Sequence, residues 1–381
     1  MSAPTQDRQP GRDGMIARMA FAHTRNVCVG TAREFAARGV TPEDFFSMEA
    51  GQLAALTGLR SSFFDREYRD RALEQAAAEY DFLSDNRLRA IFYTDPDYPT
   101  RLLECDDAPA ILYVAGRTSP QARHVVAIVG TRHCTTYGQS VTSRLVADLA
   151  EALDDLLIVS GLAYGVDIAA HRAALKAGIP TGAVLAHGLN TVYPSDHRNE
   201  AAAMVREGGF LASEYRSCDP IHRGNFLARN RIVAGLADVT VVVESDLKGG
   251  AMTTAGIASA YQREVMAVPG RVFDTYSRGC NRLIAENRAS IVRDAGDIIE
   301  ACGWTRRPVE GVQSTLALDI SDEQRTVMHF VNDHPEATIN EIAIAMGLTI
   351  PRMQSMLFEM EMSDLIVSIP GNRYGVTAPL D

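Results

Sequence analysis

The sequence predicts an α/β protein built on a mostly parallel sheet with helices on both faces, flanked by a small helical module and a small C-terminal domain. Two observations carry this prediction. From about residue 124, hydrophobic runs of strand length alternate with amphipathic helical stretches. Small or glycine-containing turns join several of these runs to the helices that follow them.

The composition limits the class of protein. The chain has 381 residues, of which 46% are hydrophobic and 22% charged, as in ordinary globular proteins, and this length predicts two or three domains. No apolar run reaches the roughly 18 residues of a membrane span, and the polar start resembles no signal peptide. The six cysteines lie far apart without a Cys-x-x-Cys pair, so we expect reduced thiols, a cytoplasmic location and no zinc site.

The charge is distributed unevenly. The net charge of −11 argues at first against a nucleic-acid partner. Residues 309–381, however, hold eleven acidic and three basic side chains, a net charge of −8. The middle of the chain is therefore closer to neutral and can hold a local basic patch.

The N-terminal part precedes the alternating pattern. Residues 1–14 are predicted to be a disordered tail, and residues 15–83 a small helical module of the SAM or helix-hairpin-helix type. Thr41 and Ser47 are the expected helix caps in this module. Two strands separated by a short helical turn then lead from residue 84 into the main domain, which we expect to end at residue 302.

The main domain repeats a strand, a turn and a helix. The full units cover 124–153, 156–178, 179–209 and 239–260, with shorter strands at 209–215 and 264–271 and a last strand and helix at 289–302. Such alternation predicts a parallel sheet, and ligands of such sheets lie beyond the carboxyl ends of the strands.

The C-terminal part has a different pattern. Residues 303–319 have the composition of a linker. Residues 320–381 predict three helices and a hairpin around a Pro-Gly-Asn turn, which is the outline of a winged helix.

Four strand ends carry small or glycine-rich turns, at 130–132, 160–165, 188–194 and 248–254. One such turn is weak evidence, because turns need glycine for their dihedral angles. Several at one edge of one sheet favour a groove that binds phosphate. The candidate contacts from these turns are Gly130, Thr131, Arg132, Gly161, Lys248, Gly249, Gly250 and Thr253.

The segment 221–237 adds basic side chains in an acidic protein. Its arginines include Arg223, and it contains no acid. Guanidinium groups bind phosphates and an aromatic face can stack on a base, although a buried core position for Phe226 fits the pattern equally well. The candidate contacts here are Asn225, Phe226, Arg229, Asn230 and Arg231.

Catalytic patterns are weaker. Asp167 and His171 share one helical face, but a capping Asp and a buried His explain this spacing better than a catalytic pair. The lysine at 248 precedes the glycines, so there is no Walker A motif. Glu214 and Glu244 end strands near the groove; an acid–base role stays open, while bonding turn amides or pairing with an arginine is favoured.

An ordered set of motifs resembles a known family. These are VAIVGTRHCTTYG, IVSGLAYGVDIAAHRAAL, GLNTVYPSDHRN, GGFLASEY, NFLARNRIVAGLADVTVVVES, GGAMTTAGIASAYQREVMAVPG and GCNRLIAENRASIV. In this order, over about residues 90–300, they resemble the DprA (Smf) family of DNA-processing proteins. The flanking helical module and winged helix fit the three-part layout of that family.

The resemblance implies an extended Rossmann-like domain that binds single-stranded DNA, forms homodimers and loads the RecA recombinase in natural transformation or homologous recombination. It implies no chemical reaction, no cofactor and no membrane partner. In the family, a Gly-Thr/Ser-Arg turn and an Arg-Asn-Arg segment build the phosphate pocket. Here these are Gly130–Thr131–Arg132 and the run 229–231, with Gly249 and Gly250 beside them.

The chain departs from the family pattern in the main domain and in both flanks. The chain has LKGGAMTT where many members have a Ser-Gly-Ser turn, and RNVCVGTARE where a Gly-x-Gly hairpin is common. The acidic winged helix offers only Arg352 on its expected recognition helix, so we expect it to contact protein rather than DNA.

Two alternatives come from other functional classes. One is a nucleotide-binding or nucleotide-cleaving enzyme of the related phosphoribohydrolase superfamily. Aligning the paired glycines with the Pro-Gly-Gly-x-Gly-Thr-x-x-Glu loop of those enzymes puts Met252 at the third glycine and Gly256 at the catalytic glutamate, which argues against it. The other is a transcription regulator, which the charge of the winged helix disfavours.

Overall fold

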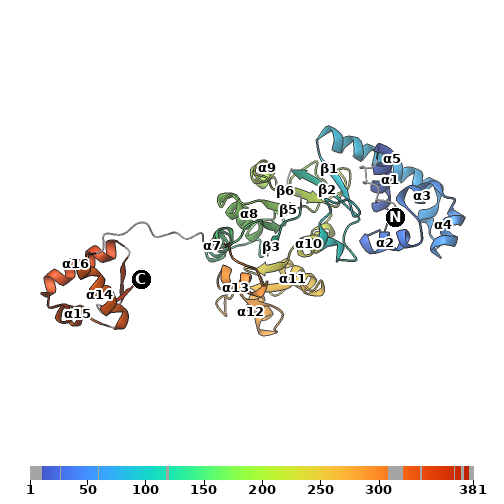
Figure 1. Cartoon of the computed structure of the whole chain (residues 1–381). Helices are drawn as coiled ribbons and strands as arrows, with labels where there is room; N and C mark the ends of the chain where they lie inside the picture. The colour runs from blue at the N-terminus through green and yellow to red at the C-terminus, as the bar shows by residue number, and fades with distance from the viewer. Residues whose placement is uncertain are drawn as a thin grey trace, which may run out of the picture. The chain divides into compact units, whose positions relative to one another are not determined.

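The structure is a computed structural model that describes residues 11–25, 27–58, 60–116, 120–307, 321–334, 337–363, 365–369 and 373–376. The chain divides into two compact units, Met1–Arg307 and Pro308–Asp381. Figure 1 shows the course of the chain through both units.

A nine-stranded sheet forms the centre of the first unit, in the order β1-β2-β6-β5-β4-β3-β7-β8-β9. Its strands are β1 (Arg89–Phe92), β2 (Ile111–Gly116), β3 (His124–Val129), β4 (Leu156–Ser160), β5 (Thr181–Val184), β6 (Phe210–Ser213), β7 (Val239–Val242), β8 (Glu264–Ala267) and β9 (Ser290–Ile291). The pairs from β6 through β9 are parallel, while β1–β2 and β2–β6 are antiparallel. The predicted α/β fold with a mostly parallel sheet is confirmed.

The strand order reverses between β3 and β7. The chain passes from β3 outward through β4 and β5 to β6, and then returns to place β7 on the other side of β3. In open parallel sheets, such a switch point leaves a crevice between the loops at the carboxyl ends of the two strands.

Alternating side chains of β3 divide between two cores. Val125, Ala127 and Val129 pack on one face of the sheet, and Val126 and Ile128 on the other. This two-residue period follows from strand geometry, and its uniform hydrophobicity matches a sheet that is covered on both sides.

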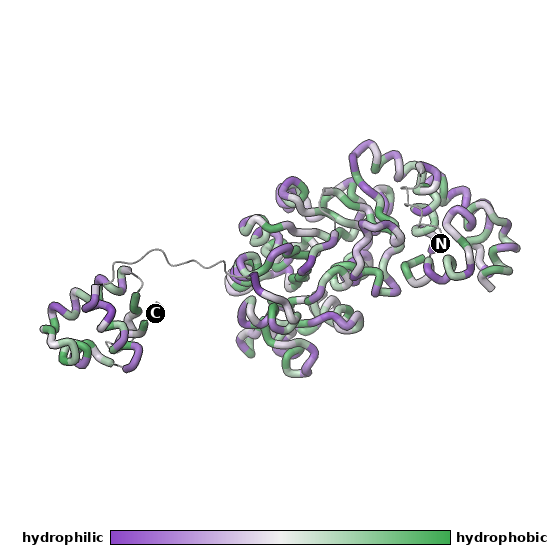
Figure 2. The backbone as a smooth tube through the Cα atoms, in the orientation of Figure 1, coloured by the Kyte–Doolittle hydropathy of each residue, from purple (hydrophilic) through white to green (hydrophobic). Residues whose placement is uncertain are grey.

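Helices cover both faces of the sheet. The first core includes side chains of α6 (Thr100–Leu103), α10 (Arg223–Leu236), α11 (Gly250–Ala260) and α12 (Arg278–Ala285). The second core includes side chains of α7 (Thr136–Ala152), α8 (Val166–Lys176) and α13 (Ala295–Ala301). A smaller core joins α9 (Arg198–Arg206) to β5 and β6. Hydrophobic and hydrophilic segments alternate along these helices, as expected for amphipathic helices on a core (Figure 2).

The helical module packs against the β1–β2 end of the sheet (Figure 1). Its elements are α1 (Arg12–Ala22), α2 (Val29–Ala37), α3 (Pro42–Ser47), α4 (Ala50–Thr57), η1 (Ser62–Phe64) and α5 (Arg66–Asp85). Phe21, Phe35 and Phe45 form its centre, with ring centroids 5.3–5.8 Å apart in edge-to-face pairs. Such pairs add specific packing to the burial of apolar area.

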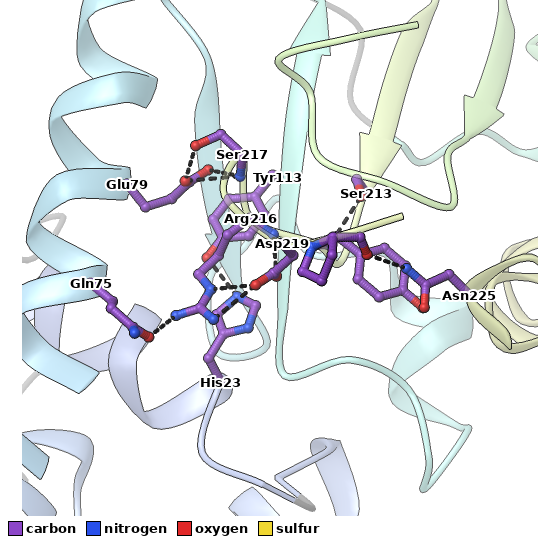
Figure 3. A network of polar contacts seen from close by, with 11 residues as sticks. His23, Gln75, Glu79, Tyr113, Ser213, Arg216, Ser217, Asp219 and Asn225 are labelled. Atoms are coloured by element: carbon purple, nitrogen blue, oxygen red, sulfur yellow. Dashed lines mark hydrogen bonds and ion pairs between the residues drawn. The ribbon is translucent and has the colours of Figure 1, made fainter. Parts of the chain in front are cut away.

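Polar contacts fix the segment after β6 to the helical module (Figure 3). The Ser217 amide and hydroxyl both donate to the Glu79 carboxylate of α5, at 2.9 Å and 2.5 Å. Arg216 donates to Gln75 Oε1 at 2.7 Å and forms an ion pair with Asp219 at 2.8 Å. This segment leads directly into α10, so the module holds the residues that precede that helix.

The second unit has the predicted winged-helix elements. Helices α14 (Asp322–Asp333), α15 (Ile339–Met346) and α16 (Ile350–Met362) surround a core with the hairpin strands β10 (Ile366–Ile369) and β11 (Arg373–Val376). The Pro-Gly-Asn turn predicted between these strands lies outside the described residues.

Three local predictions need comment. Thr41 caps α3 as predicted, through a box with Asp44. The prediction for Ser47 is wrong, because Ser47 ends α3 and the Glu49–Gln52 box begins α4. Helix α1 begins at Arg12, inside the predicted tail; the rest of that tail up to residue 10 lies outside the described residues.

The packed body of the first unit continues beyond residue 302. Trp304 packs on the second core and Arg307 pairs with Asp154 at 2.8 Å. Residues 308–319 of the predicted linker lie outside the described part of the chain.

Candidate functional site

A pocket of about 390 Å³ opens at the switch point between β3 and β7. Its walls are the turns after β3, β4 and β7, together with one side of α10. Ten predicted contacts line it: Gly130, Thr131, Arg132, Gly161, Phe226, Arg229, Asn230, Lys248, Gly249 and Gly250. The parallel sheet therefore brings together turns that are far apart in the sequence.

Glu244 organises the turn after β3. Its carboxylate accepts hydrogen bonds from the Thr135 amide at 2.9 Å and the Thr135 hydroxyl at 2.5 Å, and its carbonyl oxygen accepts from the Thr131 amide at 2.6 Å. Glu244 is only 4% exposed. These bonds give Glu244 the structural role favoured by the sequence, which is to hold turn amides.

Asp167 and Arg229 organise the turn after β4. Asp167 Oδ2 accepts from the amides of Gly161 at 3.1 Å and Ala163 at 3.3 Å. Arg229 Nη1 donates to the Gly161 carbonyl oxygen at 2.6 Å and to the carbonyl oxygen of Val184. A Cβ atom at Gly161 would lie 2.4 Å from the guanidinium, so this close approach requires glycine.

Arg229 is a fixed positive charge in the pocket wall. It is 5% exposed, and burial lowers its pKa while the nearby Asp167 carboxylate opposes that effect. Burial also raises the pKa of Asp167, and Arg229 opposes that shift in turn. A guanidinium stays protonated even when its pKa falls moderately, so the wall keeps its charge.

Arg132 and Phe226 lie together at the exposed side of the pocket. The Arg132 guanidinium carbon is 5.7 Å from the centroid of the Phe226 ring, a cation–π distance. Tyr193 contacts the same ring edge-to-face at 5.8 Å. Phe226 is half-buried and lines the pocket, so the alternative of a buried core position does not hold.

The turn after β7 adds a helix N-terminus and a lysine. Gly249 precedes α11 and gives it no side-chain cap, and Gly250 and Ala251 line the pocket. The first amides of a helix have no partners inside the helix and carry partial positive charge. Together with the exposed Lys248, this turn is suited to an anion.

Three predicted contacts do not line this pocket. Arg231 pairs with Glu214 at 2.5 Å, and Asn225 donates to the Pro220 carbonyl oxygen at 3.3 Å beside a separate cavity of about 340 Å³. Thr253 faces solvent, whereas Thr254 lines the pocket. Neighbouring helical residues point about 100° apart, which separates Thr253 from Thr254 and Arg231 from the pocket-lining Asn230.

Comparison with known proteins identifies the family. Residues 89–303 match the family model for DNA recombination-mediator protein A, and residues 313–372 match the DprA winged helix domain. The chain belongs to the DprA family. A putative DNA processing protein DprA of Mycobacterium tuberculosis is 36% identical over 310 residues, covering 77% of this chain and 79% of the relative.

Solved DprA structures agree with this assignment. The X-ray structure of DNA processing protein A from Streptococcus pneumoniae matches with a TM-score of 0.61 and 28% identity, covering 76% of this chain and 97% of that one. DNA processing protein A from Helicobacter pylori, whose structure was described for its single-stranded DNA binding mode, matches with a TM-score of 0.50 and 30% identity. That match covers 56% of this chain and 95% of the other.

Sequence reasoning missed part of this DprA pocket. Tyr276 reaches it from the loop after β8, and its ring stacks on His133 with centroids 6.1 Å apart. Ser245 and Asp246 line it from the turn after β7. The sequence feature that could have indicated Tyr276 is the stretch PGRVFDTYSRG after β8, which has two aromatic residues beside a Pro-Gly turn.

The contacts of Asp167 and His171 are those of structural residues, since Asp167 accepts from turn amides and His171 bonds to Thr181. Thr181 Oγ1 donates to the Ile158 carbonyl oxygen at 2.8 Å, so it accepts from His171 Nδ1 at 2.7 Å.

The described residues contain no group of three or more His, Cys, Asp or Glu side chains that could hold a metal ion. Within the same residues, every helix is too short or too polar to cross a membrane.

Proposed function

We propose that this chain binds single-stranded DNA without sequence preference through the pocket between β3 and β7. The observation that carries the proposal is the convergence of Arg132, Arg229 and Lys248 with the N-terminus of α11 around one pocket at the switch point. Guanidinium groups, an ammonium group and free helix amides are the donors that phosphates require. The single-stranded DNA binding described for the Helicobacter pylori relative supports the same ligand.

The donors in this pocket explain the expected lack of sequence preference. Contacts to phosphate position a strand without distinguishing its bases, and stacking on an aromatic face is open to every base. Phe226 offers such a face beside Arg132, so one residue can contact a base while the other holds the adjacent phosphate. Binding to phosphates releases counterions, and we expect affinity to fall with salt.

Binding rather than bond cleavage is the proposed activity. The two carboxylates that line the pocket are engaged, since Asp167 accepts from two amides and Asp246 pairs with Arg278 at 3.0 Å. Gly256 occupies the position of the phosphoribohydrolase glutamate. A nucleotide-cleaving role is therefore less well supported than strand binding, and release of free base from a nucleoside monophosphate by the pure protein would contradict this proposal.

We also propose protein partners and an oligomeric state for this chain. Membership of the DprA family supports a role in DNA recombination. We propose that the chain transfers the bound strand to the RecA recombinase, and that it works in the cytoplasm as a homodimer. The acidic winged helix is proposed to contact protein, because its charge disfavours phosphate.

Binding of an oligo-dT strand, measured by fluorescence anisotropy, tests this function directly. Arg132→Ala should weaken binding similarly for oligo-dT and for mixed sequences. Arg144→Ala is the matched control, because Arg144 is exposed on α7 and pairs only with Asp148 of its own helix among the described residues. Equal affinities of wild type and Arg132→Ala would contradict the assignment of the pocket.

A further inference from the structure

An uncovered aromatic side chain lies on the loop after β8, residues 268–277, at the same edge of the sheet as the pocket. Phe273 is 96% exposed and its neighbour Val272 is 74% exposed. Single exposed apolar side chains are common on protein surfaces. Phe273 and Val272, however, are neighbours beside a candidate binding site, which makes this tip a candidate contact surface.

The loop is anchored on both sides of this tip. Tyr137 donates to the Pro269 carbonyl oxygen at 3.0 Å, and the Asn281 side chain exchanges two hydrogen bonds with Gly270 at 2.9 Å and 3.2 Å. The Ser245 amide donates to the Tyr276 carbonyl oxygen at 2.6 Å. These bonds hold the base of the loop, so Phe273 is presented from a fixed frame.

Tyr276 joins this loop to the phosphate pocket. It lines that pocket and also a neighbouring cavity of about 880 Å³, which Phe273 and Arg271 line as well. The His133–Tyr276 stack lies at this boundary. Tyr276 therefore lies between the pocket at the switch point and the cavity that Phe273 lines.

The chemistry of the loop matches a strand of nucleic acid. Arg271 is exposed and has no ion-pair partner among the described residues, and it stands two positions from Phe273. Surfaces that bind single strands combine cationic side chains with aromatic faces. The loop also holds the carboxylate of Asp274, so its net charge is zero, and its contribution to binding should come from stacking.

We propose that Phe273 is a second base-stacking platform, on which the single strand lies after it leaves the phosphate pocket past Tyr276. This inference rests on the proposed function, because it extends the path of the same ligand. It assigns to the loop a contact with a base and not with a phosphate.

Paired oligonucleotides test the platform. Wild type, Phe273→Ala and Phe273→Trp are titrated with oligo-dT of about 16 nucleotides and with an abasic strand of the same length, which keeps the phosphates and lacks the bases. Phe358→Ala is the matched control, since Phe358 is 63% exposed on α16 of the other unit. Phe273 is so exposed that its loss should leave folding unchanged.

The expected result is specific to stacking. Phe273→Ala should weaken binding of oligo-dT about five-fold or more, Phe273→Trp should restore it, and the abasic strand should bind all variants alike. The slope of log affinity against log salt should stay unchanged in Phe273→Ala, whereas it should decrease by about 0.7 in Arg132→Ala.

Other outcomes overturn the inference. Unchanged affinity of Phe273→Ala for oligo-dT, or an equal loss on the abasic strand, rejects the platform while the proposed function stands through Arg132. A change in self-association or in recombinase binding without a change in DNA affinity assigns the loop to a protein contact and also rejects it. If wild type binds no single strand at all, the proposed function fails and the platform fails with it.

Discussion

The guanidinium of Arg229 lies directly against the backbone of Gly161, with Nη1 2.6 Å from the Gly161 carbonyl oxygen. This contact joins α10 to the end of β4 and places a buried charge in the wall of the pocket. The pocket thus depends on a glycine that contributes no side chain of its own.

Gly161→Ala should displace Arg229, because the new Cβ would lie 2.4 Å from the guanidinium. We expect a loss of stability of about 1–3 kcal/mol, as for overpacking in a core, together with weaker binding of oligo-dT. Urea denaturation and fluorescence anisotropy measure the two effects. Gly224→Ala is the control, because a Cβ there meets no atom within 4 Å; wild-type binding by Gly161→Ala would refute the structural role of this contact.

Arg132 and Phe226 should differ in their salt dependence. Arg132→Ala should lower affinity and also lower the salt slope by about 0.7, because one phosphate contact is lost. Phe226→Ala should lower affinity and leave the slope nearly unchanged, because it removes an aromatic face. Anisotropy titrations at several salt concentrations separate these outcomes, and identical slopes for both variants would argue against the division of roles.

Arg231→Met should affect stability more than DNA binding. The substitution leaves Glu214, a partly buried carboxylate, without the partner it has at 2.5 Å. We expect a loss of about 1–3 kcal/mol in the free energy of unfolding, because an unsatisfied buried charge is costly. A large loss of oligo-dT affinity with unchanged stability would instead return Arg231 to the binding site.

The stability of the first unit should fall with acid because of His171. Burial is the main reason that its pKa falls to about 3, and electrostatic interactions with His197 and Arg229 add to the effect. The unfolded chain takes up this proton near pH 6.5 and the folded chain does not, so stability is lost as pH falls from about 6.5 toward 3. The contribution is at most about 1.4 kcal/mol per pH unit.

Fluorescence of Trp304, the only tryptophan, can follow this unfolding in urea at several pH values. His171→Leu removes the titrating group and should flatten the pH dependence, although it also loses the bond to Thr181 and lowers stability at pH 7. The same pH dependence in wild type and His171→Leu would show that other groups dominate.

The sequence predicted the sheet and the meeting of the turns because both follow from the strand–helix alternation and the common edge of parallel strands. It did not show which individual residues of a helix face the pocket. Arg231 and Thr253 were chosen with their neighbours, yet each points away from the pocket that Asn230 and Thr254 line. The face that a helix turns toward the pocket depends on its rotation about its own axis. Packing against the sheet determines this rotation, and local composition does not reveal it.

Tyr276 and Phe273 were missed for another reason. Their loop follows an outer strand, and its residues make no glycine-rich phosphate turn of the kind that marked the other strand ends. Only the twist and order of the assembled sheet bring this loop beside the turn after β3.

The contact between Glu79 and Ser217 sets a limit on how the molecule can be shortened. A form that began after α5 would leave the Ser217 amide and hydroxyl without their acceptor and would take His23 away from the Tyr113 hydroxyl. It would also expose to water the side chains of Phe92 and Ile111, which the module now covers. Such a fragment should aggregate, and any loss of DNA binding by it would report misfolding rather than a DNA contact made by the removed helices.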